Sequence, residues 1–140
     1  MPGESEKRTT VREWAEKAEH DLLTASHMLG LGRRCPTDTV CFHAQQCIEK
    51  YIKAAMVWRD IEFPRIHDIA VLLSALPRDL RPDLIPAEQE RLTHAATRLR
   101  YPGADNPSLA EARQAVRSAR AVRRELRARL ARVLGRRGGR

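Results

Sequence analysis

The sequence has few aromatic residues and no long apolar run. Only 4% of its 140 residues are Phe, Trp or Tyr, while 42% are hydrophobic, so a core must be built mainly from Ala, Leu, Val and Ile. Scarce aromatic and β-branched runs favour helices over sheets. No segment approaches about 18 consecutive apolar residues, so no membrane-spanning helix is expected. The polar, charged segment from Met1 to Thr10 likewise predicts no secretory signal.

Cysteine is also scarce, with only Cys35, Cys41 and Cys47. An odd number without a secretory signal is typical of the reducing cytoplasm, where we expect this protein. Cys41 and Cys47 are six residues apart, a rise of about 9 Å on one helix, which excludes a disulfide between them. The sequence has neither Cys-x-x-Cys nor two His four residues apart, so we expect no metal and no cofactor. We interpret the thiols as small core-filling residues.

Acidic residues are nearly missing from the C-terminal segment. From Arg113 onward there are eleven Arg and one acid, Glu125, which gives +10 of a total net charge of +8, so residues 1–112 sum to −2. Five of these arginines share a helical arc of roughly 80°, and a solvated face normally alternates in sign. The arc predicts a nucleic-acid-binding patch, and Arg-rich genome composition is the alternative explanation. The five residues are Arg113, Arg117, Arg120, Arg124 and Arg127.

Apolar spacing predicts five helices. They cover about residues 10–29, 36–59, 67–76, 87–99 and 107–134. Thr9 or Thr10 is the expected N-cap of the first helix, and Pro107-Ser108 the start of the last. Short connections favour antiparallel neighbours, so we predict an all-α, four- to five-helix up-and-down bundle over residues 10–134. Residues 1–9 are expected to be a flexible N-terminus and residues 135–140 a disordered basic tail.

The second predicted helix carries polar residues beside its apolar face. His43, Gln46, Lys50 and Lys53 fall within an arc of roughly 80°, and Glu49 precedes Lys53 by four residues, the favourable order for an ion pair. One interpretation is a solvated face with a single ion pair. The other is the wall of a groove for a phosphate or nucleotide, because an imidazole, an amide and two ammonium groups offer several donors without a metal.

Three segments together resemble the HEPN domain family. Residues 42–55 read Phe-His-Ala-Gln-Gln-Cys-Ile-Glu-Lys-Tyr-Ile-Lys-Ala-Ala, which is similar to the family's long-helix signature. Two shorter pieces follow in the family's order, Ile66-His67-Asp68-Ile69 with Leu72-Leu73, and Arg100-Tyr101-Pro102. The resemblance covers about residues 12–125. It implies a helical bundle that commonly forms homodimers and is associated with nucleotide or RNA binding, either as the partner of a minimal nucleotidyltransferase or as a ribonuclease toxin.

Four further residues are candidates for the same groove. Arg98, Arg100 and Tyr101 end the fourth predicted helix, where the arginines either cap its carbonyl groups or bind phosphate in a fork while Tyr101 stacks on a base. His67 either caps the third helix or adds a second imidazole near His43.

The resemblance departs from the family's nuclease motif, an Arg followed after four to six residues by His. Seven residues separate Arg59 from His67, and eight separate Arg34 from His43. We therefore expect a non-enzymatic, dimeric, nucleotide- or RNA-binding partner of a minimal nucleotidyltransferase, in a toxin–antitoxin-like pair. One alternative is a metal-independent ribonuclease with a rearranged site that uses His43, His67 and Arg100. The other is a structural module whose last helix docks an acidic partner.

Overall fold

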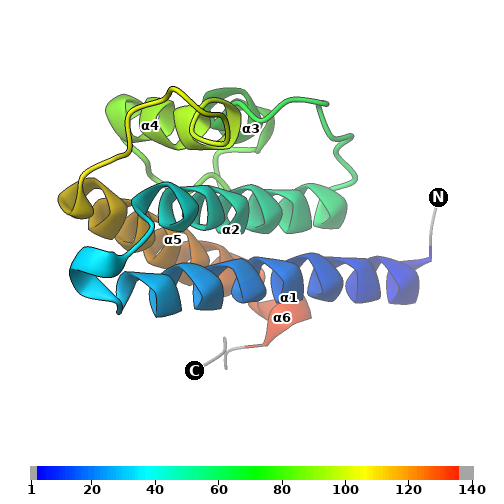
Figure 1. The fold of residues 1–140 in the computed structure, drawn as a ribbon. Coiled ribbons are helices and arrows are strands. Elements are labelled where there is room, and N and C mark those ends of the chain that lie inside the picture. Colours follow the sequence, from blue (N-terminus) through cyan, green and yellow to red (C-terminus); the bar gives the residue numbers. More distant parts are fainter. Residues whose placement is uncertain (1–2, 136–140) are drawn as a thin grey trace.

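A computed structural model describes residues 3–135, and within that range all regular structure is helical (Figure 1). The elements are α1 (Glu4–Leu29), the 3-10 turn η1 (Gly32–Arg34), α2 (Thr37–Trp58), α3 (Ile69–Ala75), α4 (Pro86–Thr97), α5 (Leu109–Arg129) and α6 (Ala131–Leu134). The predicted all-α class is confirmed.

Helix α2 lies at the centre of the bundle. Figure 1 shows α1 on one side of it, α3 and α4 on the other, and α5 crossing behind. A helix with neighbours on several sides must be apolar around most of its circumference, and α2 has twelve buried residues. Most are small or aliphatic, as the composition predicted, and Tyr51 is the largest fully buried side chain.

The three cysteines are free and buried, which confirms the prediction that they fill the core. Burial raises the pKa of all three thiols, and for Cys41 the value reaches about 12. Thiolate, the reactive form, is therefore suppressed at neutral pH.

Helix α1 begins at Glu4, six residues before the predicted start, so the predicted cap at Thr9 or Thr10 is wrong and residues 4–9 are helical. Contacts distant in sequence explain the extension. The Nζ of Lys7 lies 2.9 Å from a carboxylate oxygen of Asp60 and 5.2 Å from the centre of the Trp58 ring. These contacts stabilise a first turn that has no side-chain cap.

The last predicted helix is divided in two. Ser108 caps the start of α5 in a capping box. Its side chain accepts a hydrogen bond from the backbone N–H of Glu111, and the side chain of Glu111 accepts one from the backbone N–H of Ser108. The helix ends at Arg129, and the short α6 follows Leu130. The expected tail lies, apart from Gly135, outside the described residues. Within residues 3–135, no helix has both the length and the apolar character needed to cross a membrane.

Candidate functional site

The first cluster of the candidate site is organised by Asp21, which α1 presents to α2. This residue is only 8% exposed. One of its carboxylate oxygens accepts a hydrogen bond from Nδ1 of His43 at 2.7 Å, and the other from Nζ of Lys50 at 2.5 Å. Both partners stay partly open to solvent. The carboxylate therefore holds an imidazole and an ammonium group, two turns apart on α2, in fixed positions.

Glu49 organises a second cluster on α2 itself. It is 2% exposed, and its Oε1 accepts a hydrogen bond from Nδ1 of His67 at 2.8 Å. Its Oε2 accepts one from Nε2 of Gln46 at 3.3 Å and lies 3.9 Å from Nζ of Lys53. The predicted Glu49–Lys53 pair is thus present, but it is part of a buried network and not of a solvated surface.

Two aromatic rings fix the position of Lys53. Its Nζ lies 5.3 Å from the centre of the Trp14 ring and 5.7 Å from that of Phe63. The rings contact each other edge to face, with centres 5.6 Å apart. An ammonium group over aromatic faces gains electrostatic attraction, so Lys53 has partners on both the carboxylate and the aromatic side.

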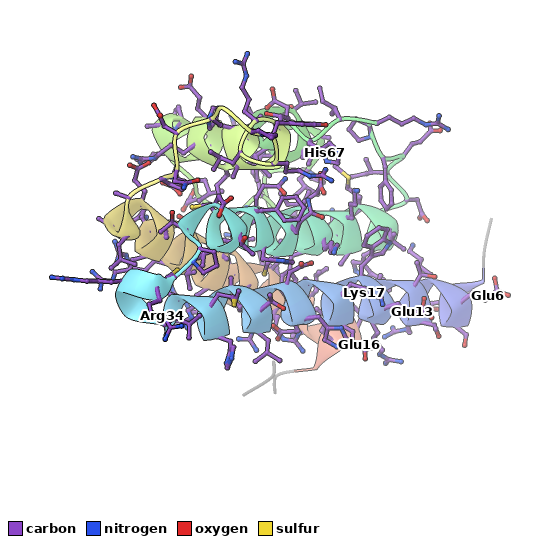
Figure 2. The ribbon with its side chains drawn as sticks, viewed as in Figure 1. Glu6, Glu13, Glu16, Lys17, Arg34 and His67 are labelled. Carbon is purple, nitrogen blue, oxygen red and sulfur yellow. The ribbon has the colours of Figure 1, made fainter. Side chains whose placement is uncertain are left out.

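An open depression adjoins the second cluster. Its volume is about 530 Å³, and Lys53, Glu62, Phe63, Arg65 and His67 are among the residues that line it. His67 lies on the α3 and α4 side of α2 (Figure 2), and its side chain is 54% exposed. The depression therefore has an ammonium, a guanidinium and an imidazole group on its wall.

The Arg-Tyr-Pro segment divides between two places. The guanidinium of Arg100 lies 5.1 Å from the centre of the Phe42 ring, and that ring contacts the edge of His43 at 5.4 Å between centres. Arg100 thereby adjoins the first cluster. Arg98 and Tyr101 instead line a different depression of about 560 Å³ with His94, and Tyr101 is 67% exposed.

The structure thus brings six of the eight predicted ligand-binding residues into one polar row and sets Arg98 and Tyr101 apart. We call this row the α2 strip. It consists of His43, Gln46, Lys50, Lys53, His67 and Arg100 with the two carboxylates of Asp21 and Glu49.

Asp21 is the residue that the sequence analysis missed. A signal for it exists, because Asp21 follows Ala18 by three residues and precedes Ala25 by four, which places an acid on the buried stripe of α1. A buried charge needs a partner, so this position alone indicates a cation or imidazole on the facing helix.

The five arginines of the predicted nucleic-acid patch differ in their surroundings. Arg127 faces inward, where its Nη1 donates to the Tyr51 hydroxyl at 3.0 Å and lies 3.5 Å from a carboxylate oxygen of Glu19. Its side chain is only 15% exposed, so it does not belong to an open patch. The remaining four are exposed, namely Arg113, Arg117, Arg120 and Arg124.

No three His, Cys, Asp or Glu side chains of residues 3–135 are grouped as a metal ion would require. The α2 strip offers hydrogen-bond donors and imidazoles that are held by carboxylates.

The fold and the α2 strip define a helical bundle with polar side chains along its central helix. The model of the HEPN domain family matches residues 11–129, and the chain belongs to this family. A solved structure similar to it is the crystal structure of TT1696 from Thermus thermophilus, with a TM-score of 0.69 and 28% sequence identity over 85% of this chain and 97% of that chain. No curated protein matches the chain significantly.

Proposed function

We propose that this HEPN protein binds nucleotides or RNA, without cleaving them, through phosphate contacts to the α2 strip. The observation that carries the proposal is the convergence of Lys53, Arg65 and His67 on the depression of about 530 Å³. Ammonium, guanidinium and imidazolium groups are the side-chain donors that suit a phosphate.

The charge balance of the strip supports an anionic ligand. The carboxylates of Asp21 and Glu49 are offset by Lys50 and Lys53, to which they are bound. Arg100 lies over an aromatic ring, and a guanidinium in that position keeps its full charge. On the wall of the depression, the charge of Arg65 is balanced by that of Glu62. The charge of Arg100 therefore remains as an excess of positive charge, even when both imidazoles are neutral.

The internal contacts also lower the entropic cost of binding. A flexible Lys or Arg loses rotamer freedom when it binds a ligand, and that loss weakens affinity by roughly 0.5–1.5 kcal/mol per side chain. In the strip, Lys50 is already held by Asp21 and Lys53 by Glu49 and two rings. A phosphate would therefore bind donors that are already in position.

Titration of ATP, GTP and a short RNA by calorimetry tests the proposal. We expect Arg65→Ala and the double variant Lys50→Ala/Lys53→Ala to weaken binding about tenfold or more, since a charge-assisted hydrogen bond contributes roughly 1.5–3 kcal/mol. Arg132→Ala is the matched control, because Arg132 is exposed on α6, a helix that contributes no residue to the strip. Equal binding by all four proteins, or none at millimolar ligand, would refute the proposal.

One observation favours a second candidate function, RNA cleavage without a metal. A carboxylate can only accept, so Nδ1 of His43 and of His67 must carry the shared proton, which leaves Nε2 of each ring free for acid–base chemistry. The two imidazoles are however held at different heights on α2. His43 and Glu49, whose carboxylate binds His67, are six residues apart, a rise of about 9 Å. That separation suits two neighbouring phosphates better than one scissile bond.

Incubation of RNA with the pure protein and EDTA separates the two functions. Under the binding proposal the RNA stays intact. Cleavage that His67→Ala abolishes, while leaving the affinity for a non-cleavable RNA analogue unchanged, would favour the ribonuclease.

We further propose that the protein acts in the cytoplasm as a homodimer beside a minimal nucleotidyltransferase, in a toxin–antitoxin-like pair. Leu23 and Leu31 support a protein contact, because α1 and the turn after it expose 70% and 49% of these apolar residues. Light scattering is expected to give twice the chain mass of 15.9 kDa, and a monomer at micromolar concentration would contradict the dimer. Co-purification with an adjacently encoded nucleotidyltransferase tests the partner.

A further inference from the structure

The outward side of α5 carries four exposed arginines that no carboxylate of residues 3–135 neutralises. Arg117 donates only to the amide of Gln114, and Arg120 only to the hydroxyl of Ser26. Within residues 3–135, Arg113 and Arg124 have no hydrogen-bonding or ionic partner. The two acids of α5 are engaged elsewhere, Glu111 in the capping box and Glu125 with a backbone N–H of Asp83. We call these four arginines the α5 arginine face.

The spacing of the face matches an extended polyanion. The four positions lie within an arc of roughly 60°, and Arg113 and Arg124 are separated by a rise of about 16 Å. A stacked strand advances about 3.4 Å per nucleotide, so the row corresponds to about five nucleotides. A single mononucleotide is too short to neutralise all four guanidinium groups.

Several cations elsewhere on this protein are paired with a carboxylate. Lys7 pairs with Asp60, Arg59 with Asp79, and Arg91 with Glu88. On the arginine face, by contrast, neighbouring guanidinium groups recur at three and four residues, a spacing at which like charges destabilise a helix by roughly 0.2–0.5 kcal/mol per pair. A bound polyanion would relieve this repulsion.

The chemistry of the face suits a nucleic acid better than a protein. Protein interfaces combine arginines with buried aromatic anchors near their centre, whereas α5 contains no aromatic residue and contributes no apolar side chain larger than alanine to this arc. Phosphate backbones need no such anchor, because guanidinium forks and released counterions supply the affinity.

The face is separate from the α2 strip. On α1, Asp21 contacts the strip and Ser26 contacts Arg120 of the face. These two residues are five positions apart, about 140° around the helix. We infer that the α5 arginine face is a second, sequence-independent binding surface for the phosphate backbone of single-stranded RNA. This inference adds a surface to the proposed function but does not depend on ligand binding by the strip.

Salt dependence of RNA binding tests the inference. Fluorescence anisotropy of a labelled 12-nucleotide RNA would be measured between about 50 and 300 mM salt, where each phosphate contact to a single strand contributes about 0.7 to the slope of log affinity against log salt. We expect Arg113→Gln/Arg117→Gln/Arg120→Gln/Arg124→Gln to reduce the slope by about 2.8, four times that contribution. Replacing the same four residues by Lys keeps most of the slope.

A charge-matched control is available in Arg33, Arg34, Arg78 and Arg132, which are exposed and lie outside the face. Replacing these four by Gln is expected to change the slope by less than about 1. Equal slopes for the face variant and the control, or no RNA binding by the wild type at about 50 mM salt, would overturn the inference. Equally tight binding of a polyglutamate peptide would overturn it in favour of an acidic protein. Binding of ATP by the face variant reports separately on the α2 strip.

Discussion

Two sets of arginines lie on α5, and they differ in what faces them. Arg123 and Arg127 point toward α1, where Nε of Arg123 lies 2.7 Å and Nη1 of Arg127 3.5 Å from the same carboxylate oxygen of Glu19. The four arginines of the α5 arginine face are exposed and pair with no carboxylate in the described part of the chain. The same residue type on one helix is therefore part of the packing in the first set and available to a partner in the second.

The α2 strip resembles the inward arginines in this respect. Lys50 and Lys53 are each held by a carboxylate that is at least nine-tenths buried. Cations of the strip therefore contribute to stability as well as to the proposed binding surface, whereas those of the arginine face make only exposed hydrogen bonds to Gln114 and Ser26 within residues 3–135. Substitutions that separate stability from binding test this comparison.

The largest effect on stability is expected from Asp21→Ala. Loss of the buried carboxylate leaves Lys50 and His43 without their partner, and breaking a buried pair costs about 3 kcal/mol. Urea unfolding followed by circular dichroism measures it. The control is Glu16→Ala, an exposed acid on the same helix whose nearest partner is His20 at 3.9 Å, with an expected change below about 0.5 kcal/mol. Similar losses in both variants would show that Asp21 has no special role.

A matched pair on α5 tests the two sets of arginines directly. Arg127→Met removes the contacts to Glu19 and Tyr51 and is expected to lower the free energy of unfolding by about 2 kcal/mol, less than a fully buried pair because some solvent reaches the side chain. Arg124→Met, on the outward side, should change it by less than about 0.5 kcal/mol. Equal effects of the two substitutions in thermal or urea unfolding would contradict the distinction.

Tyr51→Phe removes the hydrogen bond that the hydroxyl accepts from Arg127 and should cost at least about 1 kcal/mol at neutral pH. Its pH dependence is more specific. Burial raises the pKa of Tyr51 above its ordinary value of 10.0, so above about pH 10 the unfolded chain releases a proton that the folded chain retains. The resulting stability is complete below about pH 10 and is lost as pH rises beyond it. Unfolding free energies from about pH 8 to 11 should fall less steeply in Tyr51→Phe than in the wild type.

Local patterns predicted the helices and part of the α2 strip, whereas contacts between distant segments determined the rest. The three- and four-residue spacing of His43, Gln46, Lys50 and Lys53 places them on one side of α2 whatever the tertiary structure. Asp21 lies 22 residues before His43 and a helix away, so spacing within α2 could not indicate it. The early start of α1 depends in the same way on contacts across more than fifty residues.

The inward orientation of the Arg127 side chain likewise could not be predicted from spacing within α5. Its helical position lies at the margin of the arc shared by the other four arginines, and only the packing of α5 against α1 and α2 brings Glu19 and Tyr51 within reach of its guanidinium. Helical spacing alone therefore identified an arginine-rich side of α5 but not where the open part of that side ends.

The smallest expected effect is on the stability of the four-arginine Gln variant used for RNA binding. Within residues 3–135 the α5 arginine face makes no ion pair, so its loss removes like-charge repulsion and the two exposed hydrogen bonds to Gln114 and Ser26. The variant should therefore unfold within about 0.5 kcal/mol of the wild type. At low salt it should be the more stable protein, and rising salt should stabilise the wild type more than the variant because screening acts on the repulsion. Unfolding curves at about 20 and 500 mM salt measure this difference. A loss of about 2 kcal/mol would instead mean that these arginines stabilise the fold, and the contrast with Arg123 and Arg127 would fail.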